Sequence, residues 1–276
     1  MPKKLMVLPK LKFTKIFCVL IVSCLVFGCN EKMQDTAVIG CPNNTAGMLV
    51  NYAIKHYGSN QFDIQFADGF SSYLMMDCCS SKSTWSLTSG ELDAAVLCPD
   101  AAAAFLEKTD DFLLAGPLTY NSEALVCKDP EKVPEHIGFM NGQERQKEIL
   151  MSSYYADATY HPVLATSLPY ALSVGQIDAA VLDIATAVTL DYQYLLIESN
   201  IPTSVLVVSK DFYNSQLYPA LLLSIENAAA EIKEYRPFCE AMTFLFSQEM
   251  GRKEYTKWQS AEIKFPDLSA MAVPIP

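Results

Sequence analysis

Four cysteines of this sequence are placed where they could bind a ligand or a metal ion. Cys41 and Cys98 each come directly after a predicted strand, and Cys78 and Cys79 follow the strand between these two. Ligands of open α/β sheets bind beyond the carboxyl ends of parallel strands, so these four cysteines are candidate ligand-binding residues. Thiolates bind soft metals and also suit organometals or thiol-bearing solutes. Cys41 and Cys98 are the candidate metal ligands, and we expect their sulfurs to lie close together.

The cysteines could equally serve the structure of the protein. A free cysteine is commonly a small buried hydrophobic residue, which suits Cys127 within Ala-Leu-Val-Cys and Cys239 on an apolar helix. Exported cysteines usually pair, so three disulfides are one alternative, and free thiols in an anaerobe are another. The adjacent residues Cys78 and Cys79 bridge to each other only with strain. The sequence has no Cys-x-x-Cys motif, so a structural zinc site is not indicated.

Polar residues occupy the corresponding loops. Asn43 and Thr45 follow Cys41 and are candidates to begin a helix. With the four cysteines, we expect the ligand to be bound by Asn43, Thr45, Asn141, Arg145 and Asp183. Asn141, Arg145 and Asp183 follow strands of a later α/β segment, and we expect Arg145 and Asp183 to face the cysteines across a cleft. Binders of small anions usually need an arginine fork or helix N-termini. The chain has three arginines, and only Arg145 lies near the predicted site, which argues against a small anion.

Charge and motifs exclude several classes of function. Removing an N-terminal signal with its five lysines takes the formal net charge from −11 to −16. Such an acidic chain is a poor nucleic-acid binder, because positive charge supplies most of that affinity. The sequence contains no Gly-x-Ser-x-Gly, His-Glu-x-x-His, phosphate-binding loop or dinucleotide fingerprint, so we do not expect an enzyme or a bound cofactor.

The N-terminus resembles a bacterial lipoprotein signal. Five lysines precede an apolar run over 16–28, which is too short to span a bilayer but suits an export signal. The run ends Leu-Val-Phe-Gly-Cys, which is similar to a lipobox, so Cys29 would be diacylated and become the new N-terminus. Residues 1–28 are then the signal peptide and 29–35 a polar tether to the outer face of the cell membrane. An ordinary cleaved signal or a buried strand is the alternative.

Alternating strands and helices follow. Strands are predicted at 36–40, 62–67 and 92–97, with helices between them through His56 and over 81–89. This order favours parallel βαβ units with right-handed crossovers. Further on we predict a strand at 137–140, a helix opened by a capping box of Asn141 and Glu144, and a strand at 159–163.

The sequence also contains an internal repeat. Residues 90–105 align without gaps on 175–190, and seven of these 16 positions are identical. The alignment makes Asp183 the counterpart of Cys98. Two similar strands, 123–129 and 204–211, both end in Lys-Asp. Residues 214–249 are predicted to be helical, with one apolar face running from Leu217 to Tyr235, and the proline-rich tail is predicted to fray.

These features together resemble the extracytoplasmic solute-binding proteins of ABC importers with the type 2 periplasmic-binding fold, nearest in pattern to sulfonate, taurine and thiamine-precursor binders. The cysteines also resemble those of solute-binding (seleno)proteins of anaerobic bacteria. The resemblance implies an α/β fold of two lobes, each a mostly parallel sheet flanked by helices, joined by two crossover segments. It assigns 36–128 and 205–262 to lobe 1, 129–204 to lobe 2 and 263–276 to a tail.

The resemblance further implies a function. The protein would be a monomer that binds a small solute in the interlobe cleft and delivers it to permease and ATPase subunits. Cleft thiols would suit a thiol-reactive, soft-metal or organosulfur solute. A thiol-redox lipoprotein that uses the same cysteines is the alternative from another class.

The lipoprotein hypothesis predicts the behaviour of one variant. Cys29→Ala removes the sulfur that accepts the diacylglycerol, so the variant should leave the membrane fraction or remain unprocessed. Fractionation with detection of the N-terminus by mass spectrometry checks this. Cleavage at another position together with unchanged membrane fractionation would contradict it.

Overall fold

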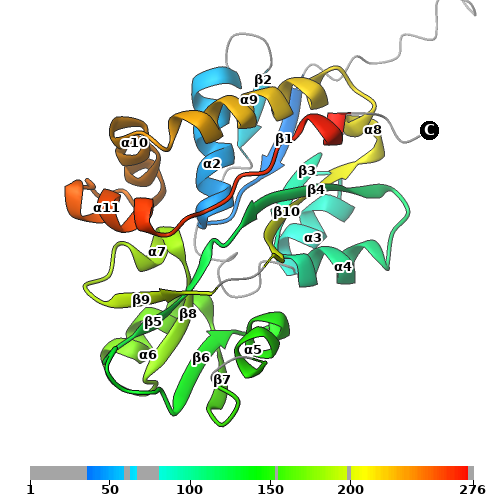
Figure 1. The fold of residues 1–276 in the computed structure, drawn as a ribbon. Helices are drawn as coiled ribbons and strands as arrows, with labels where there is room; N and C mark the ends of the chain where they lie inside the picture. The colour runs from blue at the N-terminus through cyan, green and yellow to red at the C-terminus, as the bar shows by residue number, and fades with distance from the viewer. Residues whose placement is uncertain (1–35, 59–62, 67–80, 153–154, 198–199, 273–276) are drawn as a thin grey trace, which may run out of the picture. The chain divides into compact units, whose positions relative to one another are not determined.

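The computed structural model describes residues 36–58, 63–66, 81–152, 155–197 and 200–272. Within them the strands form two five-stranded sheets, each flanked by helices (Figure 1). The predicted signal peptide, Cys29, Cys78 and Cys79 lie outside the described residues.

The first sheet has the strand order β2-β1-β3-β10-β4. Strands β1, β2 and β3 are parallel, and β10 runs antiparallel to both β3 and β4. Its strands are β1 Thr36–Gly40, β2 Asp63–Phe66, β3 Ala94–Leu97, β4 Phe112–Tyr120 and β10 Pro202–Ser209.

The second sheet has the order β7-β6-β8-β5-β9 and repeats this plan. Strands β6, β7 and β8 are parallel, while β5 pairs antiparallel with β8 and β9. Its strands are β5 Glu123–Cys127, β6 His136–Met140, β7 Thr159–Val163, β8 Ala179–Asp183 and β9 Gln193–Leu196.

The chain crosses between the sheets earlier than the sequence predicted. Strand β5 was assigned to lobe 1, but it pairs along its whole length with β8 of the second sheet. The predicted boundary after residue 128 is therefore too late. The first crossover consists of Asn121 and Ser122, and Asn121 adopts a left-handed φ of 58° that turns the chain. The chain returns between β9 and β10.

Helices cover both faces of the first sheet. Ala37 and Ile39 of β1 point to the face that packs against α2, α9 and α10, while Val38 packs on the other face. This alternation is the period of two expected for a strand buried on both sides. The helical segments of this part are α2 Thr45–Ala53, η1 Ile54–Gly58, α3 Ser81–Thr88, α4 Pro99–Leu106, α8 Lys210–Tyr213, α9 Leu217–Glu231, α10 Tyr235–Phe246, α11 Arg252–Ser260 and η3 Ser269–Ala272.

The second sheet is covered in the same way. Val126 and Ala180 pack against α6 on one face, and Leu125 and Val181 pack on the other face, where Leu150 of α5 lies. The helical segments are α5 Glu144–Met151, η2 Ala165–Ser167, α6 Leu168–Ser173 and α7 Ile184–Ala187.

Two local predictions need correction. Helix α5 begins at Glu144 with Gln143 as its N-cap, so Asn141 does not open it. The reason is that the Asn141 N–H donates to the carbonyl of Val163 and thus continues the strand pairing, while Gly142 turns the chain with φ +86°. The long helix after residue 214 is interrupted at Ile232, so Tyr235 starts a new helix.

The tail was predicted to fray, and over its described residues it packs instead. Lys264 forms a β-bridge with Tyr120, and the backbone N–H of Leu268 donates to the Glu226 carboxylate at 3.0 Å. Leu268 is only 2% exposed and belongs to the main core of the first lobe, as does Met271. In Figure 1 this red segment runs back along the body of the protein. Apolar residues between the prolines supply the contacts that a fraying tail would lack.

The packed tail gives a stability prediction. Leu268→Ala should lower the free energy of unfolding by about 2 kcal/mol, because it removes buried methyl groups and leaves a cavity. Leu223→Ala is the matched control, since Leu223 is 58% exposed, and it should change stability by about 0.5 kcal/mol or less. Urea unfolding measures both. Equal effects would mean that the tail does not contribute to the core.

Candidate functional site

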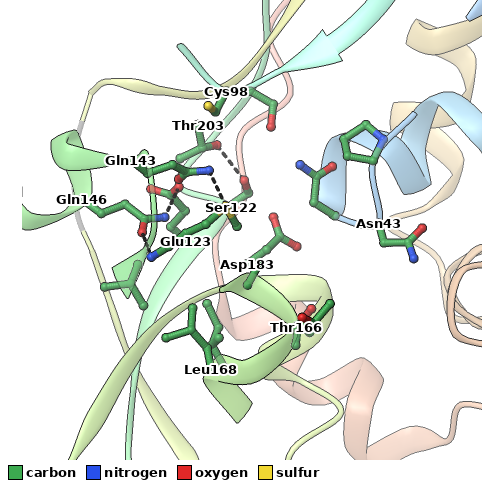
Figure 2. Close-up of a pocket in the computed structure, with 18 of the residues that line it drawn as sticks. Asn43, Cys98, Ser122, Glu123, Gln143, Gln146, Thr166, Leu168, Asp183 and Thr203 are labelled. Carbon is green, nitrogen blue, oxygen red and sulfur yellow. Dashed lines mark hydrogen bonds between the residues drawn. The ribbon is translucent and has the colours of Figure 1, made fainter. Parts of the chain in front are cut away.

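A cavity of about 120 Å³ is lined by loops that belong to both sheets (Figure 2). The first sheet contributes the loop before α2, the start of α4 and the first residues of β10. The second contributes the start of β5, the ends of β6 and β8, and the segments that follow β6, β7 and β8. The lining residues are Pro42, Asn43, Asn44, Cys98, Ser122, Glu123, Met140, Gln143, Gln146, Ala165, Thr166, Leu168, Pro169, Val181, Leu182, Asp183, Thr186, Thr203 and Ser204.

The loop before α2 is held tightly in place. The Asn44 side chain accepts a hydrogen bond from the Gly47 N–H at 2.8 Å and caps the helix. A Cβ atom on Gly47 would lie 1.8 Å from the carbonyl oxygen of Pro42, so only glycine allows this approach. Asn43 and Asn44 are thereby positioned at the cavity.

Asp183 connects the two parts of the site. Its Oδ1 accepts hydrogen bonds from the backbone N–H of Thr45 at 2.8 Å and from the Thr45 hydroxyl at 2.7 Å. The Ala185 N–H donates to the same oxygen at 2.9 Å and makes Asp183 the N-cap of α7. Thr45 begins α2 beside the first sheet, and Asp183 ends β8 of the second, so one carboxylate oxygen bridges them.

Burial raises the pKa of Asp183 to about 7. The hydrogen bonds from Thr45 and Ala185 lower this pKa, while the negative charge of Glu123 raises it further. Among the residues that the structure describes, no lysine, arginine or histidine forms an ion pair with Asp183. Ionised Asp183 therefore has no countercharge among the ion pairs of the described residues.

Glu123 is the second carboxylate at the cavity, and it forms an ion pair with Arg145. Nη2 of Arg145 donates to both of its oxygens at 3.0 and 3.1 Å, and Nε2 of Gln146 donates to Oε1 at 2.9 Å. Both charged side chains are only 10% exposed. In such a pair each side chain supplies a countercharge for the other in the interior.

Hydroxyl groups line the crossover segments. Thr119, Ser122 and Thr203 are buried, and their oxygens lie 2.6 to 3.4 Å from one another. Thr203 also donates to the Thr119 carbonyl at 3.1 Å. Figure 2 shows Ser122 and Thr203 side by side at the edge of the cavity.

Cys41 and Cys98 lie in different hydrophobic clusters. Cys98 lines the cavity as the N-cap residue of α4. Cys41 belongs to the hydrophobic core of the first lobe, where its Sγ lies 3.7 Å from the Ile39 carbonyl oxygen. Burial raises the pKa of the Cys41 thiol far above its usual range. The physical reason is the strand period, since Cys41 continues the inward alternation of Ala37 and Ile39. The predicted cleft position of Cys41 therefore needs correction.

Two further cysteines, Cys127 and Cys239, are free thiols. Cys127 is buried and Cys239 is partly buried, as their apolar surroundings predict. Within the described parts of the chain, no three cysteine, histidine or acidic side chains are grouped so that they could hold a metal ion.

The remaining predicted residues divide into two groups. Asn43 and Asp183 line the cavity, and Thr45 holds Asp183. Asn141 is exposed, and Arg145 lies behind Glu123 rather than at the cavity surface.

Sequence reasoning missed several lining residues. They are Ser122, Glu123, Met140, Gln143, Gln146, Thr166, Thr186, Thr203 and Ser204. The signal that was available is the pair of similar strands, because Ser122, Glu123, Thr203 and Ser204 lie at the beginning of those two strands.

The chain matches no protein-family model and no curated protein. Solved structures do match. One is the ligand-binding component of an ABC-type import system from Staphylococcus aureus with zinc bound, with a TM-score of 0.61 and 16% identity over 86% of this chain and 87% of that chain. Another is the alkanesulfonate-binding protein SsuA from Xanthomonas axonopodis pv. citri bound to MOPS, with a TM-score of 0.60 and 12% identity over 84% and 85%. The chain has the two-lobe fold of ABC-type substrate-binding proteins.

This fold confirms the predicted fold class and the resemblance drawn from the sequence. Lipoprotein Tp32 from Treponema pallidum has a similar structure, with a TM-score of 0.56 and 13% identity over 73% of this chain and 96% of that chain. No helix in the part of the chain that the structure describes is long and apolar enough to cross a membrane.

The environment of Asp183 makes stability depend on pH. Its carboxyl ionises near 7 in the folded chain but near 3.8 when exposed, so between these values the folded state binds the extra proton. This group's contribution to stability is therefore lost as pH rises from about 4 through 7.

Asp183→Asn tests this dependence. The variant cannot ionise, so its free energy of unfolding relative to the unchanged protein should be higher at pH 8 than at pH 5, by roughly 2 kcal/mol. Urea unfolding at the two pH values measures the difference. If the two proteins differ in free energy of unfolding by the same amount at pH 5 and at pH 8, the raised pKa of Asp183 is contradicted.

Proposed function

We propose that this protein is the extracytoplasmic substrate-binding component of an ABC importer, which binds a small solute in the cavity between its lobes. The observation that supports this most directly is the cavity itself, because both sheets line it and Asp183 bonds to Thr45 across it. A solute that contacts both lobes binds the closed form more tightly than the open form, and so shifts the population toward closure.

The two crossover segments would act as the hinge. We assign residues 36–120 and 202–272 to lobe 1 and residues 123–197 to lobe 2. Permease and ATPase subunits are the proposed partners, and a lipid on Cys29 would hold the protein at the membrane. No catalytic role is proposed for any residue.

The cavity lining favours a small, partly apolar solute. Amides and hydroxyls of Asn43, Gln143 and Thr166 surround one part of the space, and Leu168 and Pro169 supply an apolar wall. Such a mixture of few polar groups and apolar surface is typical of binding sites for small organic molecules.

A soft-metal or organosulfur solute is the second candidate. It is favoured by the sulfur atoms of Cys98 and Met140, both of which line the cavity. Thiolate and thioether ligands prefer soft cations. The thiol-redox alternative lacks comparable support, because Cys41 packs in a different core cluster from Cys98.

A screen for ligand-induced stabilisation tests the proposed function. The reduced protein is heated with amino-acid derivatives, amines, organosulfur compounds, heterocycles and thiophilic metals. A transported solute should raise the melting temperature saturably, because it binds the folded state alone. Thr186→Trp should abolish the effect by filling the cavity, whereas Thr256→Trp, on the exposed side of α11, should preserve it.

Two outcomes would count against this proposal. Equal stabilisation of both tryptophan variants would place the binding outside the cavity, and a screen without any saturable hit would remove its support. Cys98→Ser separates the two solute classes. Affinity unchanged by Cys98→Ser indicates an organic solute that does not use the thiol, and lost affinity indicates a sulfur-dependent one.

A further inference from the structure

We propose that Asp183 sets the solute class by filling the cavity's own anion-binding position, so that the site excludes anions and accepts cationic solutes. This inference rests on the proposed function and concerns the same cavity. It is supported by two contacts in which a carboxylate of the chain already occupies a group that favours negative charge, one at the cavity and one behind its wall.

The first contact is at the start of α2. The Thr45 N–H belongs to the first helical turn and so has no acceptor within the helix, and the helix dipole favours negative charge there. Together with the Thr45 hydroxyl and the Ala185 N–H it makes three donors, all 2.7 to 2.9 Å from Oδ1 of Asp183. An anionic group of a solute would have to displace this oxygen to use the same donors.

The second contact concerns Arg145. Its Nη2 is bound by both oxygens of Glu123. Nε and Nη1 are buried without a hydrogen-bond partner among the described residues, but Arg145 is not among the residues that line the cavity. Of the described residues that do line it, none is lysine, arginine or histidine. The described residues of the cavity therefore offer an anion no unoccupied cationic group.

The charge that remains at the cavity is negative. Glu123 has its countercharge in Arg145, whereas Asp183 has none among the described ion pairs. Figure 2 shows the Asp183 carboxyl pointing into the space between Asn43 and Ser122. Its Oδ2 accepts no hydrogen bond from the part of the chain that the structure describes, so it is available to a donor on the solute. An ammonium or guanidinium group there would supply the missing countercharge.

Three variants separate the position of Asp183 from its charge. Asp183→Ala empties the anion-binding position, Asp183→Asn keeps it filled without the charge, and Asp183→Ser replaces the alanine variant if that one does not fold. Asp178→Ala is the matched control, because Asp178 also accepts backbone N–H bonds, from Glu135 and His136, away from the cavity.

The probes are sodium acetate and sodium methanesulfonate as anions, and methylammonium, ethylammonium and guanidinium chloride as cations. Melting temperature and calorimetric titration are measured at pH 8 and constant ionic strength. Acetate should bind Asp183→Ala at least tenfold more tightly than it binds the unchanged protein, the asparagine variant or the control. At least one cation should stabilise the unchanged protein, with at least tenfold loss of affinity in Asp183→Asn.

The opposite results would overturn the proposal. Acetate binding to the unchanged protein, or acetate binding that does not increase in either the alanine or the serine variant, would show that Asp183 does not occupy an anion-binding position. Stabilisation by none of the three cations, or equal cation affinity in the asparagine variant, would remove the preference for cations.

Failure of this inference can be told from failure of the proposed function. If the transported solute proves to be an anion bound in the same cavity, the chain remains a substrate-binding protein and only the role of Asp183 is wrong. If the protein binds no transported solute and has no permease partner, the proposed function is wrong. The acetate titration of Asp183→Ala still tests whether Asp183 occupies an anion-binding position.

Discussion

A single carboxylate oxygen links the two lobes at the cavity. Oδ1 of Asp183 binds donors of Thr45, which begins α2, and of Ala185, which follows β8. The contact fixes the loop of Asn43 and Asn44 opposite the end of β8 and encloses the cavity between them. It also places an acidic group where burial disfavours its charge, and this raises the pKa of Asp183 to about 7.

The parts of this arrangement that depend on local pattern could be predicted from the sequence. Residues 36–40 and 159–163 form strands with the predicted ends, because a short run rich in β-branched and aromatic residues is a property of neighbouring residues. The internal repeat made Cys98 and Asp183 counterparts, and both are N-cap residues that line the cavity. Repeated sequence predicts repeated geometry even where the side chains differ.

The parts that depend on distant partners could not be predicted. Strand β5 resembles β10 in sequence, yet its sheet is decided by pairing with β8, more than 50 residues away. The Glu123–Arg145 pair likewise joins residues 22 apart, and nothing in their spacing marks them as partners. Cys41 is different, because the alternation of Ala37 and Ile39 already placed it on the core side.

The hydroxyl cluster beside the first crossover can change its hydrogen-bond pattern. Thr119 belongs to β4, Ser122 to the crossover and Thr203 to β10, and each hydroxyl can both donate and accept. Rotation about its C–O bond lets each group change its acceptor within the cluster, so the buried hydroxyls can stay hydrogen-bonded in more than one arrangement. Aliphatic side chains at the same positions would have no hydrogen bonds to exchange.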